Sequence, residues 1–314
     1  MITIADIEAA RERIESRVRR TPILPLTQFQ DPPGTRAAVT LKLECLQVTG
    51  SFKARGAMNR LLGTEEGVPA AGIVTASGGN HGLAVARTAH AAGVPAKIFV
   101  PEGVSPEKVT KMRAWNAEVE IVGEVWDKSN EAAHRHAEKT GAVYFHPFAD
   151  PLVVAGQGTL GLEILSDLPE MDAILIAIGG GGLVAGVATA IRAERPGVTI
   201  IGIEPVGSPT LKACLDAGRV VTLPEVTTRV PTMACAKTDE RIYERVRETV
   251  DDIVLVSDAA MLEASRRLWF ECGIAADLSG AAALAALRQG VPALADARNI
   301  CALVCGAGPD GIAG

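Results

Sequence analysis

Short apolar runs alternate with helix-like segments along this chain, and that alternation limits the possible folds more than any other feature. Each run has the length and apolar character of a buried strand, whereas the segments between the runs favour helix. Such alternation predicts α/β sheets, mainly parallel, with helices on both faces and sites at the carboxyl ends of strands. The expected strands are residues 38–43, 73–76, 96–100, 119–122, 143–146, 173–178, 199–204 and 300–304.

A run of glycines follows the expected strand at 173–178 and precedes an expected helix at 183–192. Glycines let the backbone approach an anion closely, and a helix N-terminus adds free N–H groups and about half a positive charge. The turn is therefore a candidate phosphate site. Its spacing departs from the dinucleotide pattern G-x-G-x-x-G, and no G-K-[ST] follows it. The residues of this turn are Gly179, Gly180, Gly181, Gly182 and Leu183.

A second glycine-rich loop, S-G-G-N-H-G, lies between the expected strand at 73–76 and an alanine-rich helix at 83–92. Its N–H groups and polar side chains offer donors for a substrate carboxylate, and the asparagine can also reach a cofactor oxygen. The same residues equally fit a capped turn that satisfies orphan N–H groups. The residues assigned to substrate binding are Ser77, Gly78, Gly79, Asn80 and His81.

Lys53 stands in the run T-G-S-F-K-A-R-G, where a loop is expected to enter a helix over residues 54–62. A lone lysine is usually a solvated surface residue. Here, however, a lysine amine that can form a Schiff base accompanies two loops rich in backbone donors, which a phosphorylated carbonyl cofactor needs. Together the three runs indicate pyridoxal 5′-phosphate.

These motifs resemble the fold type II family of pyridoxal-phosphate enzymes, over nearly the whole chain. That family contains threonine and serine dehydratases, serine racemase, threonine synthase and cysteine synthase. S-F-K-A-R-G resembles its lysine motif, S-G-G-N-H-G its asparagine loop, G-G-G-G-L its phosphate loop, and I-C-A-L-V-C-G its pyridine-nitrogen site. The resemblance implies two open twisted sheets, as in the tryptophan synthase β-subunit, with the cofactor in an interdomain cleft. It also implies a large domain of residues 1–71 and 151–314 and a small domain of residues 72–150.

The resemblance further implies a role for each candidate residue. Lys53 would bind the cofactor covalently and act as the catalytic base, Phe52 would pack beside the ring, and Asn80 would bind the 3-hydroxyl. The glycine run through Leu183 would hold the phosphate. Cys305 would face the pyridine nitrogen as a neutral partner, which favours elimination; the alternative is that it is one more small buried strand residue.

Within the family, the motifs most resemble threonine and serine dehydratases. The implied reaction is β-elimination of water from an L-β-hydroxy amino acid, which gives a 2-keto acid and ammonia. Serine racemases carry an acid–base serine where this chain has Gly78, which has no proton to move. An amino-acid racemase or a β-replacement enzyme remains an alternative within the fold. A non-catalytic protein that binds an amino acid or the cofactor remains an alternative from another class.

Three departures from the family pattern leave the substrate and the metal open. Residues 229–238 differ from the usual A-D-G-x-A-V-like stretch, so the preferred β-hydroxy amino acid is not determined. Asp277 replaces a glutamate and reaches about an ångström less far, which leaves its role open. Glu204 lacks the aspartate six residues later, where Thr210 stands, so we expect no tightly bound metal. Glu204 equally fits a capping role.

Charge and composition limit the remaining classes of function. The chain has 314 residues and a formal net charge of −6, which argues against nucleic acid and acidic membranes as partners. The N-terminal segment is a charged amphipathic pattern unlike a secretory signal, and no stretch of 18 apolar residues occurs. We therefore predict a cytoplasmic enzyme for a small amino acid, and the family resemblance implies a homodimer.

Overall fold

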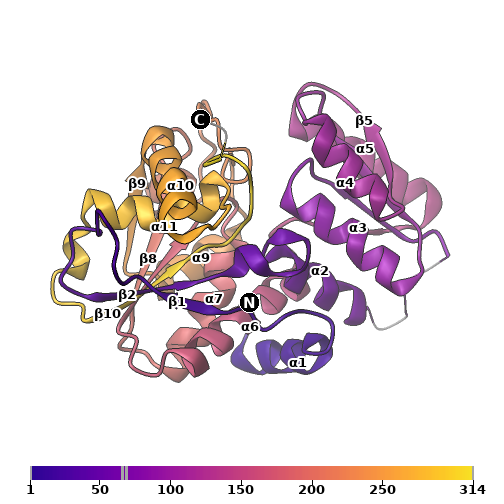
Figure 1. Ribbon diagram of the computed structural model, residues 1–314. Helices are drawn as coiled ribbons and strands as arrows, with labels where there is room; N and C mark the ends of the chain where they lie inside the picture. The colour runs from indigo at the N-terminus through magenta and orange to yellow at the C-terminus, as the bar shows by residue number, and fades with distance from the viewer. Residues whose placement is uncertain (1, 65–66, 68–69, 313–314) are drawn as a thin grey trace.

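The computed structural model describes residues 2–64, 67 and 70–312 and contains two sheets, one in each lobe of the molecule (Figure 1). The larger sheet has six strands in the order β1-β2-β10-β7-β8-β9, and the smaller has four in the order β5-β4-β3-β6. All neighbouring strands are parallel except β1 and β2. The predicted α/β class with two mainly parallel sheets is confirmed.

The strands agree closely with the apolar runs of the sequence. The larger sheet consists of β1 (Ile23–Pro25), β2 (Ala38–Lys42), β7 (Ala173–Ala177), β8 (Thr199–Pro205), β9 (Asp252–Val256) and β10 (Asn299–Leu303). The smaller sheet consists of β3 (Ile73–Ala76), β4 (Ala96–Val100), β5 (Glu118–Ile121) and β6 (Val143–Tyr144). Two strands were not predicted, β1 and β9, which are the edge strands of the larger sheet. β1 has only three residues and ends in proline, so it carries little pattern, whereas β9, with the sequence D-I-V-L-V, is as apolar as the predicted strands and was overlooked.

Helices cover both faces of each sheet, as expected for parallel strands. On the larger sheet, α11 contacts β7, β8, β9 and β10 and carries α10, whereas α7 contacts β7 and packs against α6 (Figure 1). On the smaller sheet, α3 and α4 share one apolar core and α5 another. The helices are α1 (Ile4–Ile14), α2 (Lys53–Leu62), α3 (Asn80–Ala92), α4 (Pro106–Ala114), α5 (Trp126–Thr140), α6 (Pro151–Asp167), α7 (Gly182–Glu194), α8 (Thr210–Ala217), α9 (Glu240–Thr249), α10 (Asp258–Cys272) and α11 (Leu278–Gln289).

The smaller sheet and helices α3 to α5 all fall within residues 72–150, the segment assigned to the small domain. Helix α2 joins the two lobes, because it packs against both α3 and α6. The domain boundaries themselves remain a prediction. Among the helices of the described residues, none has both the length and the apolar composition needed to cross a membrane.

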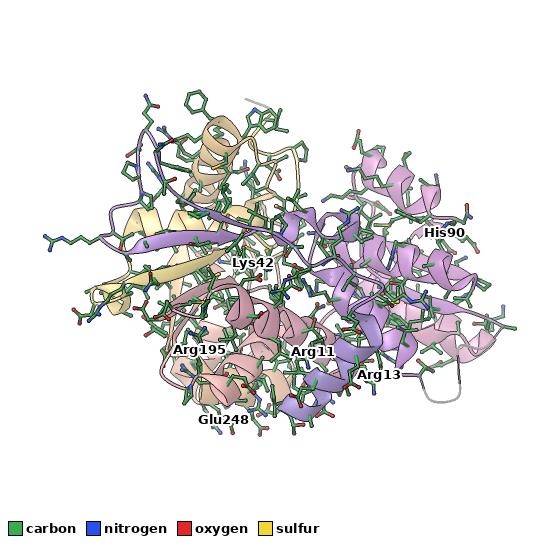
Figure 2. The ribbon with its side chains drawn as sticks, turned by 60° about the horizontal axis from the view of Figure 1, so that its bottom comes forward. Arg11, Arg13, Lys42, His90, Arg195 and Glu248 are labelled. Carbon is green, nitrogen blue, oxygen red and sulfur yellow. The ribbon has the colours of Figure 1, made fainter. Side chains whose placement is uncertain are left out.

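A buried network of charged side chains holds α2 against the larger lobe. The guanidinium of Arg55 donates two hydrogen bonds to Glu44, at 2.8 and 2.6 Å, and one to Glu163 at 2.9 Å. Lys42, labelled in Figure 2, extends from β2 to Glu163 and Asp167 at 2.6 and 2.7 Å. The side chains of Lys42 and Glu44 are 0% exposed. Each of these charges is therefore stabilised mainly by its partners and not by water.

Replacing Arg55 by methionine is expected to lower the free energy of unfolding by about 3–5 kcal/mol, because Glu44 would stay buried without its cation. Arg55→Lys should recover only part of this loss, since one ammonium group cannot form the two-point contact. Denaturant unfolding measures both changes. The control is Arg135→Met, which removes a cation that is 67% exposed and should alter stability by no more than about 0.5 kcal/mol. An equally small effect of Arg55→Met would contradict the importance of the network.

Candidate active site

Lys53 is the first residue of α2, as the sequence predicts, and its segment is fixed to the end of β10. The Phe52 N–H donates to the carbonyl of Cys305 at 3.2 Å, and Ser51 forms a bridge with Gly306. The Lys53 amine donates to the carbonyl of Pro147 at 2.7 Å and lies 5.1 Å from the centre of the Phe52 ring. Segments far apart in the sequence thus converge on one amine.

The surroundings of the Lys53 amine make its neutral form more accessible than that of an ordinary lysine. Burial lowers the pKa of Lys53 from 10.5 to about 8. Burial, and then the charge of Lys53, lower the pKa of His81 to about 3 and that of His146 to about 4, so both imidazoles are neutral at pH 7. Within the described part of the chain, no carboxylate forms an ion pair with the amine. A neutral amine can act as a nucleophile or accept a proton.

The tetraglycine turn connects β7 to α7, as predicted, and presents its N–H groups without partners. Among the residues that the structure describes, no hydrogen-bond acceptor meets the backbone N–H groups of residues 179–184. Gly181 has a φ of +91°, a left-handed conformation that favours glycine. Consecutive free donors at a helix N-terminus fit a phosphate dianion. The residues assigned to the cofactor phosphate therefore suit that group.

Close packing explains why side chains are missing from this turn. A Cβ atom on Gly180 would lie 2.3 Å from the Phe148 ring, and one on Gly179 would lie 2.7 Å from the carbonyl oxygen of Thr232. Thr238 also donates to the Gly180 carbonyl at 3.0 Å. Residues 229–238, which depart from the family pattern, therefore form one wall of the turn.

The asparagine loop follows β3 and leads into α3. The Ser77 hydroxyl accepts the Gly79 N–H at 3.3 Å, so the capped-turn alternative holds for that one group. Asn80 does not cap the helix: its side-chain amide donates to Asp277 at 2.9 Å. His81 is buried, with Nε2 3.2 Å from the Phe145 carbonyl. The loop therefore turns Asn80 toward the larger lobe.

Gly78 lies against the side chain of Val104, a residue of the same lobe. A Cβ atom at this position would be only 2.0 Å from Cγ2 of Val104. The neighbouring Gly79 is more open, since its added Cβ would meet only the Thr232 methyl group, at 3.7 Å. A side chain at position 78 thus requires Val104 to move, whereas the space above Gly79 extends toward residues 229–238.

Cys305 lies just beyond β10 and is buried, and its sulfur is 3.7 Å from the hydroxyl of Ser279. Burial raises the pKa of the Cys305 thiol, so the side chain is neutral. Ser279 in turn donates to Asp277 at 2.7 Å. Ser279 was not among the predicted site residues, although it lies only two positions after Asp277.

Glu204 has the capping role that the sequence left open. Its carboxylate accepts the N–H groups of Leu211 and Lys212 at the start of α8, at 2.8 and 2.9 Å. Burial raises its pKa to about 7. No group of three potential metal-ligating side chains occurs among residues 2–64, 67 and 70–312. The carboxylate that was considered for a cation site is therefore already used by the protein.

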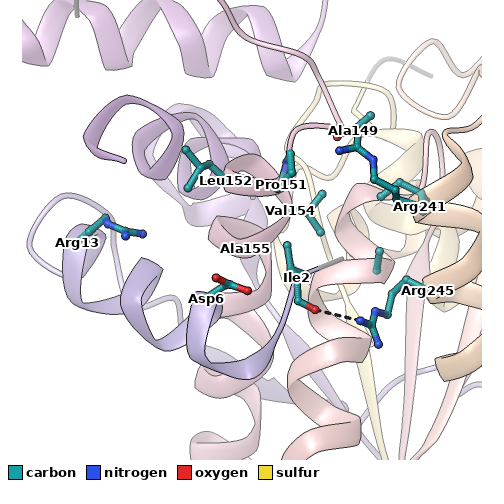
Figure 3. Close-up of a pocket in the computed structure, with 12 residues that line it drawn as sticks. Ile2, Asp6, Arg13, Ala149, Pro151, Leu152, Val154, Ala155, Arg241 and Arg245 are labelled. Atoms are coloured by element: carbon teal, nitrogen blue, oxygen red, sulfur yellow. Dashed lines mark hydrogen bonds between the residues drawn. The ribbon is translucent and has the colours of Figure 1, made fainter. Parts of the chain in front are cut away.

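A surface pocket of about 300 Å³ lies elsewhere, beside α1, α6 and α9 (Figure 3). Arg13, Arg241 and Arg245 line it, and Arg245 donates to the carbonyl of Ile2 at 3.0 Å. Neither Lys53 nor the two glycine-rich loops belong to its lining. The candidate active site is therefore distinct from this pocket.

Comparisons with known proteins show which family the chain matches. A family model described as "Pyridoxal-phosphate dependent enzyme" matches residues 14–306. L-threonine ammonia-lyase of Geobacter sulfurreducens is 40% identical over 91% of this chain and 71% of its own length. Phenylserine dehydratase of Ralstonia pickettii is 36% identical over 98% of this chain and 94% of its own. The structure of maize serine racemase superposes with a TM-score of 0.92 at 32% identity, covering 97% of this chain and 93% of that one.

Gly180→Ala is expected to weaken the binding of pyridoxal phosphate about tenfold or more, because the added carbon would displace the turn or the Phe148 ring. The quantity to measure is the dissociation constant, from the absorbance of protein-bound cofactor. Gly197→Ala is a suitable control, since nothing lies within 4 Å of a Cβ atom there. Unchanged affinity in Gly180→Ala would argue against the turn as the phosphate site.

The cofactor-free protein offers a direct test of the neutral amine. Because its pKa is lowered to about 8, Lys53 should be mostly charged below pH 8 and mostly neutral above it. Trace labelling with acetic anhydride, followed by mass spectrometry, should show half-maximal reactivity of Lys53 near pH 8. Added Nα-acetyllysine, with an ordinary amine, provides the reference. A midpoint for Lys53 near its ordinary value of 10.5 would show that burial does not shift this amine.

Proposed function

The chain belongs to the family of pyridoxal-phosphate-dependent enzymes, and from that premise we propose that it is a lyase acting on an L-β-hydroxy amino acid. The proposed reaction removes water from threonine, serine or a related substrate and ends in a 2-keto acid and ammonia. The observation that carries this choice is Gly78, which leaves the asparagine loop without an acid–base group at the racemase position. Two relatives, an ammonia-lyase and a dehydratase, have names that fit this reaction.

Each residue has a definite part in the proposal. The N–H groups of residues 179–183 hold the phosphate, Phe52 packs beside the ring, Asn80 donates to the ring hydroxyl, and Cys305 faces the ring nitrogen as a neutral thiol. When bound, pyridoxal phosphate acts as an electron sink that acidifies the Cα–H bond of the amino acid. Lys53 Nζ then accepts the Cα proton, and its lowered pKa of about 8 increases the fraction of amine that is unprotonated and able to do so near neutral pH.

The donors of the asparagine loop give the substrate its orientation. Ser77, Gly78, Gly79, Asn80 and His81 are proposed to surround the substrate carboxylate. The N–H groups of Gly78, Asn80 and His81 meet no acceptor within the described residues, so they are available for that anion. Thr232, which lies near both Gly79 and Gly179, would border the substrate side chain. We also propose the cytoplasm as its location and a homodimer as its assembly.

Racemisation is the second candidate, because the overall structure is so similar to that of maize serine racemase. It needs a proton donor on the substrate face opposite Lys53. A serine at position 78 would supply one, but the space for it is filled by Val104. Racemisation therefore requires another donor, whereas elimination requires only Lys53 on the Cα proton.

The test is Lys53→Ala, which should abolish keto-acid and ammonia formation because the base is lost. Turnover is measured across L- and D-forms of threonine, serine, phenylserine and hydroxyaspartate, and Lys108→Ala, an exposed position, is the control. Retained turnover in Lys53→Ala would contradict the assignment. A wild-type protein that forms the D-enantiomer in place of keto acid is a racemase, and one that binds cofactor without any turnover is a binding protein.

A further inference from the structure

Asp277 is a buried carboxylate at the N-terminus of α11, and it accepts hydrogen bonds from three directions. One oxygen accepts the hydroxyl of Ser279 at 2.7 Å and the N–H of Gly280 at 2.6 Å. The other accepts the side-chain amide of Asn80 at 2.9 Å. Only 9% of Asp277 is exposed. Each of these donors belongs to the protein, so the carboxylate is satisfied without water.

The partners of Asp277 come from both lobes. Asn80 follows β3 in the smaller lobe, whereas Ser279 belongs to α11 and contacts Cys305 beyond β10 in the larger lobe. Among the described residues, the Asn80–Asp277 contact is the only hydrogen bond between residues 77–82 and the larger lobe. One carboxylate therefore joins the loop at Asn80 to the strand end at Cys305.

We propose that Asp277 is a positioning residue that fixes which atoms Asn80 and Cys305 present to the cofactor. The inference rests on the proposed function, in which these two residues face the ring hydroxyl and the ring nitrogen. Both Asp277 oxygens act as acceptors, one toward Ser279 and Gly280 and the other toward Asn80, so the Asn80 amide turns its nitrogen toward Asp277. The second hydrogen on that nitrogen remains available as a donor.

Asp277 also determines the direction of hydrogen bonding at Cys305. The Ser279 hydroxyl donates its hydrogen to Asp277 and so does not donate to the Cys305 sulfur; the single thiol hydrogen lies toward Ser279 in the structure and would turn to the ring nitrogen when the cofactor binds. Without the carboxylate, the Ser279 hydrogen could rotate toward the sulfur. Asp277 therefore orders the direction of hydrogen bonding on both sides of the site, although it is not assigned any contact with the reacting atoms.

The space around Asp277 fits an aspartate closely. A Cβ atom on Gly306 would lie 2.6 Å from one carboxylate oxygen, and one on Gly308 would lie 2.7 Å from the Asp277 Cβ. The Asp277 N–H also donates to the Gly306 carbonyl at 3.0 Å. A glutamate at this position would press its extra methylene against these backbones. The departure from the family's glutamate is thus matched by the packing around it.

The experiment is Asp277→Asn, measured by the binding of pyridoxal phosphate in the absence of substrate. The single oxygen of the introduced amide would stay with Ser279 and Gly280, so its NH₂ would face Asn80 and force the Asn80 amide to present its oxygen instead. We expect the dissociation constant to rise about tenfold, equivalent to about 1.4 kcal/mol, and the absorbance maximum of the bound cofactor to shift. Asp277→Glu should not restore either property.

A double-mutant cycle separates positioning from general damage. In an Asn80→Ala background, Asp277→Asn should change the dissociation constant less than about twofold, because the side chain it acts through is gone. Ser257→Ala removes the N-cap of α10 in the same lobe and controls for the loss of a capping interaction. Thermal unfolding and circular dichroism establish that each variant is folded.

The outcomes are distinct. Wild-type affinity and absorbance in Asp277→Asn would overturn the inference, and so would an equal loss of affinity in the presence and absence of the Asn80 side chain. Failure of the proposed function appears elsewhere, as turnover that survives Lys53→Ala or as a wild-type protein without keto-acid formation. Neither of those results depends on how cofactor binding responds to position 277.

Discussion

The contact between Arg55 and Glu44 is the constraint on which the placement of the site depends. Arg55 lies two residues after Lys53 on α2, and its guanidinium is held by the carboxylates of Glu44 and Glu163. Removing one partner from such a pair leaves an uncompensated charge, so the arrangement has few alternatives of similar energy. The start of α2 is fixed as a consequence, and the Phe52 N–H bond to the carbonyl of Cys305 fixes it from the other side. The position of the Lys53 amine is thereby defined by the backbone of α2, so no ion pair is needed to hold the amine in place.

The glycines of the site are explained by contacts between segments far apart in the sequence. Gly180 faces Phe148, Gly179 faces Thr232 and Gly78 faces Val104, and in each case a Cβ atom would be closer than 3.0 Å. Neighbouring segments therefore pack closely against one side of each loop. The backbone N–H donors are left exposed on the other side. An anion held by such donors needs no cationic side chain. A chain with a formal net charge of −6 can therefore still bind the two proposed anions, the cofactor phosphate and the substrate carboxylate.

Local patterns in the sequence predicted the parts of the molecule that local physics controls. Apolar runs indicated most of the strands, and the glycine turns indicated helices expected from residues 83 and 183, which begin at Asn80 and Gly182 in the structure, because periodicity and backbone freedom are readable from neighbouring residues. The contact between Asn80 and Asp277 spans 197 positions, and no local pattern encodes it. Ser279 was missed for the same reason: its importance comes from Cys305 and Asp277, which the fold brings to it. The assignments of Lys53, the asparagine loop and the phosphate turn to the cofactor remain predictions, since they depend on family resemblance as well as on geometry.

Within the described residues no carboxylate pairs with Lys53, and this bears on the basicity of its amine. A carboxylate within hydrogen-bonding distance of an amine stabilises the ammonium form and raises its pKa, which would make the neutral form of Lys53 rarer at neutral pH. In this protein the Asp277 carboxylate is turned toward Asn80, Ser279 and Gly280, and the Lys53 amine donates to the carbonyl of Pro147. Two neutral histidines and two neutral thiols, those of Cys235 and Cys305, lie close enough to complete its electrostatic surroundings. Burial is therefore the largest influence on the protonation of the Lys53 amine.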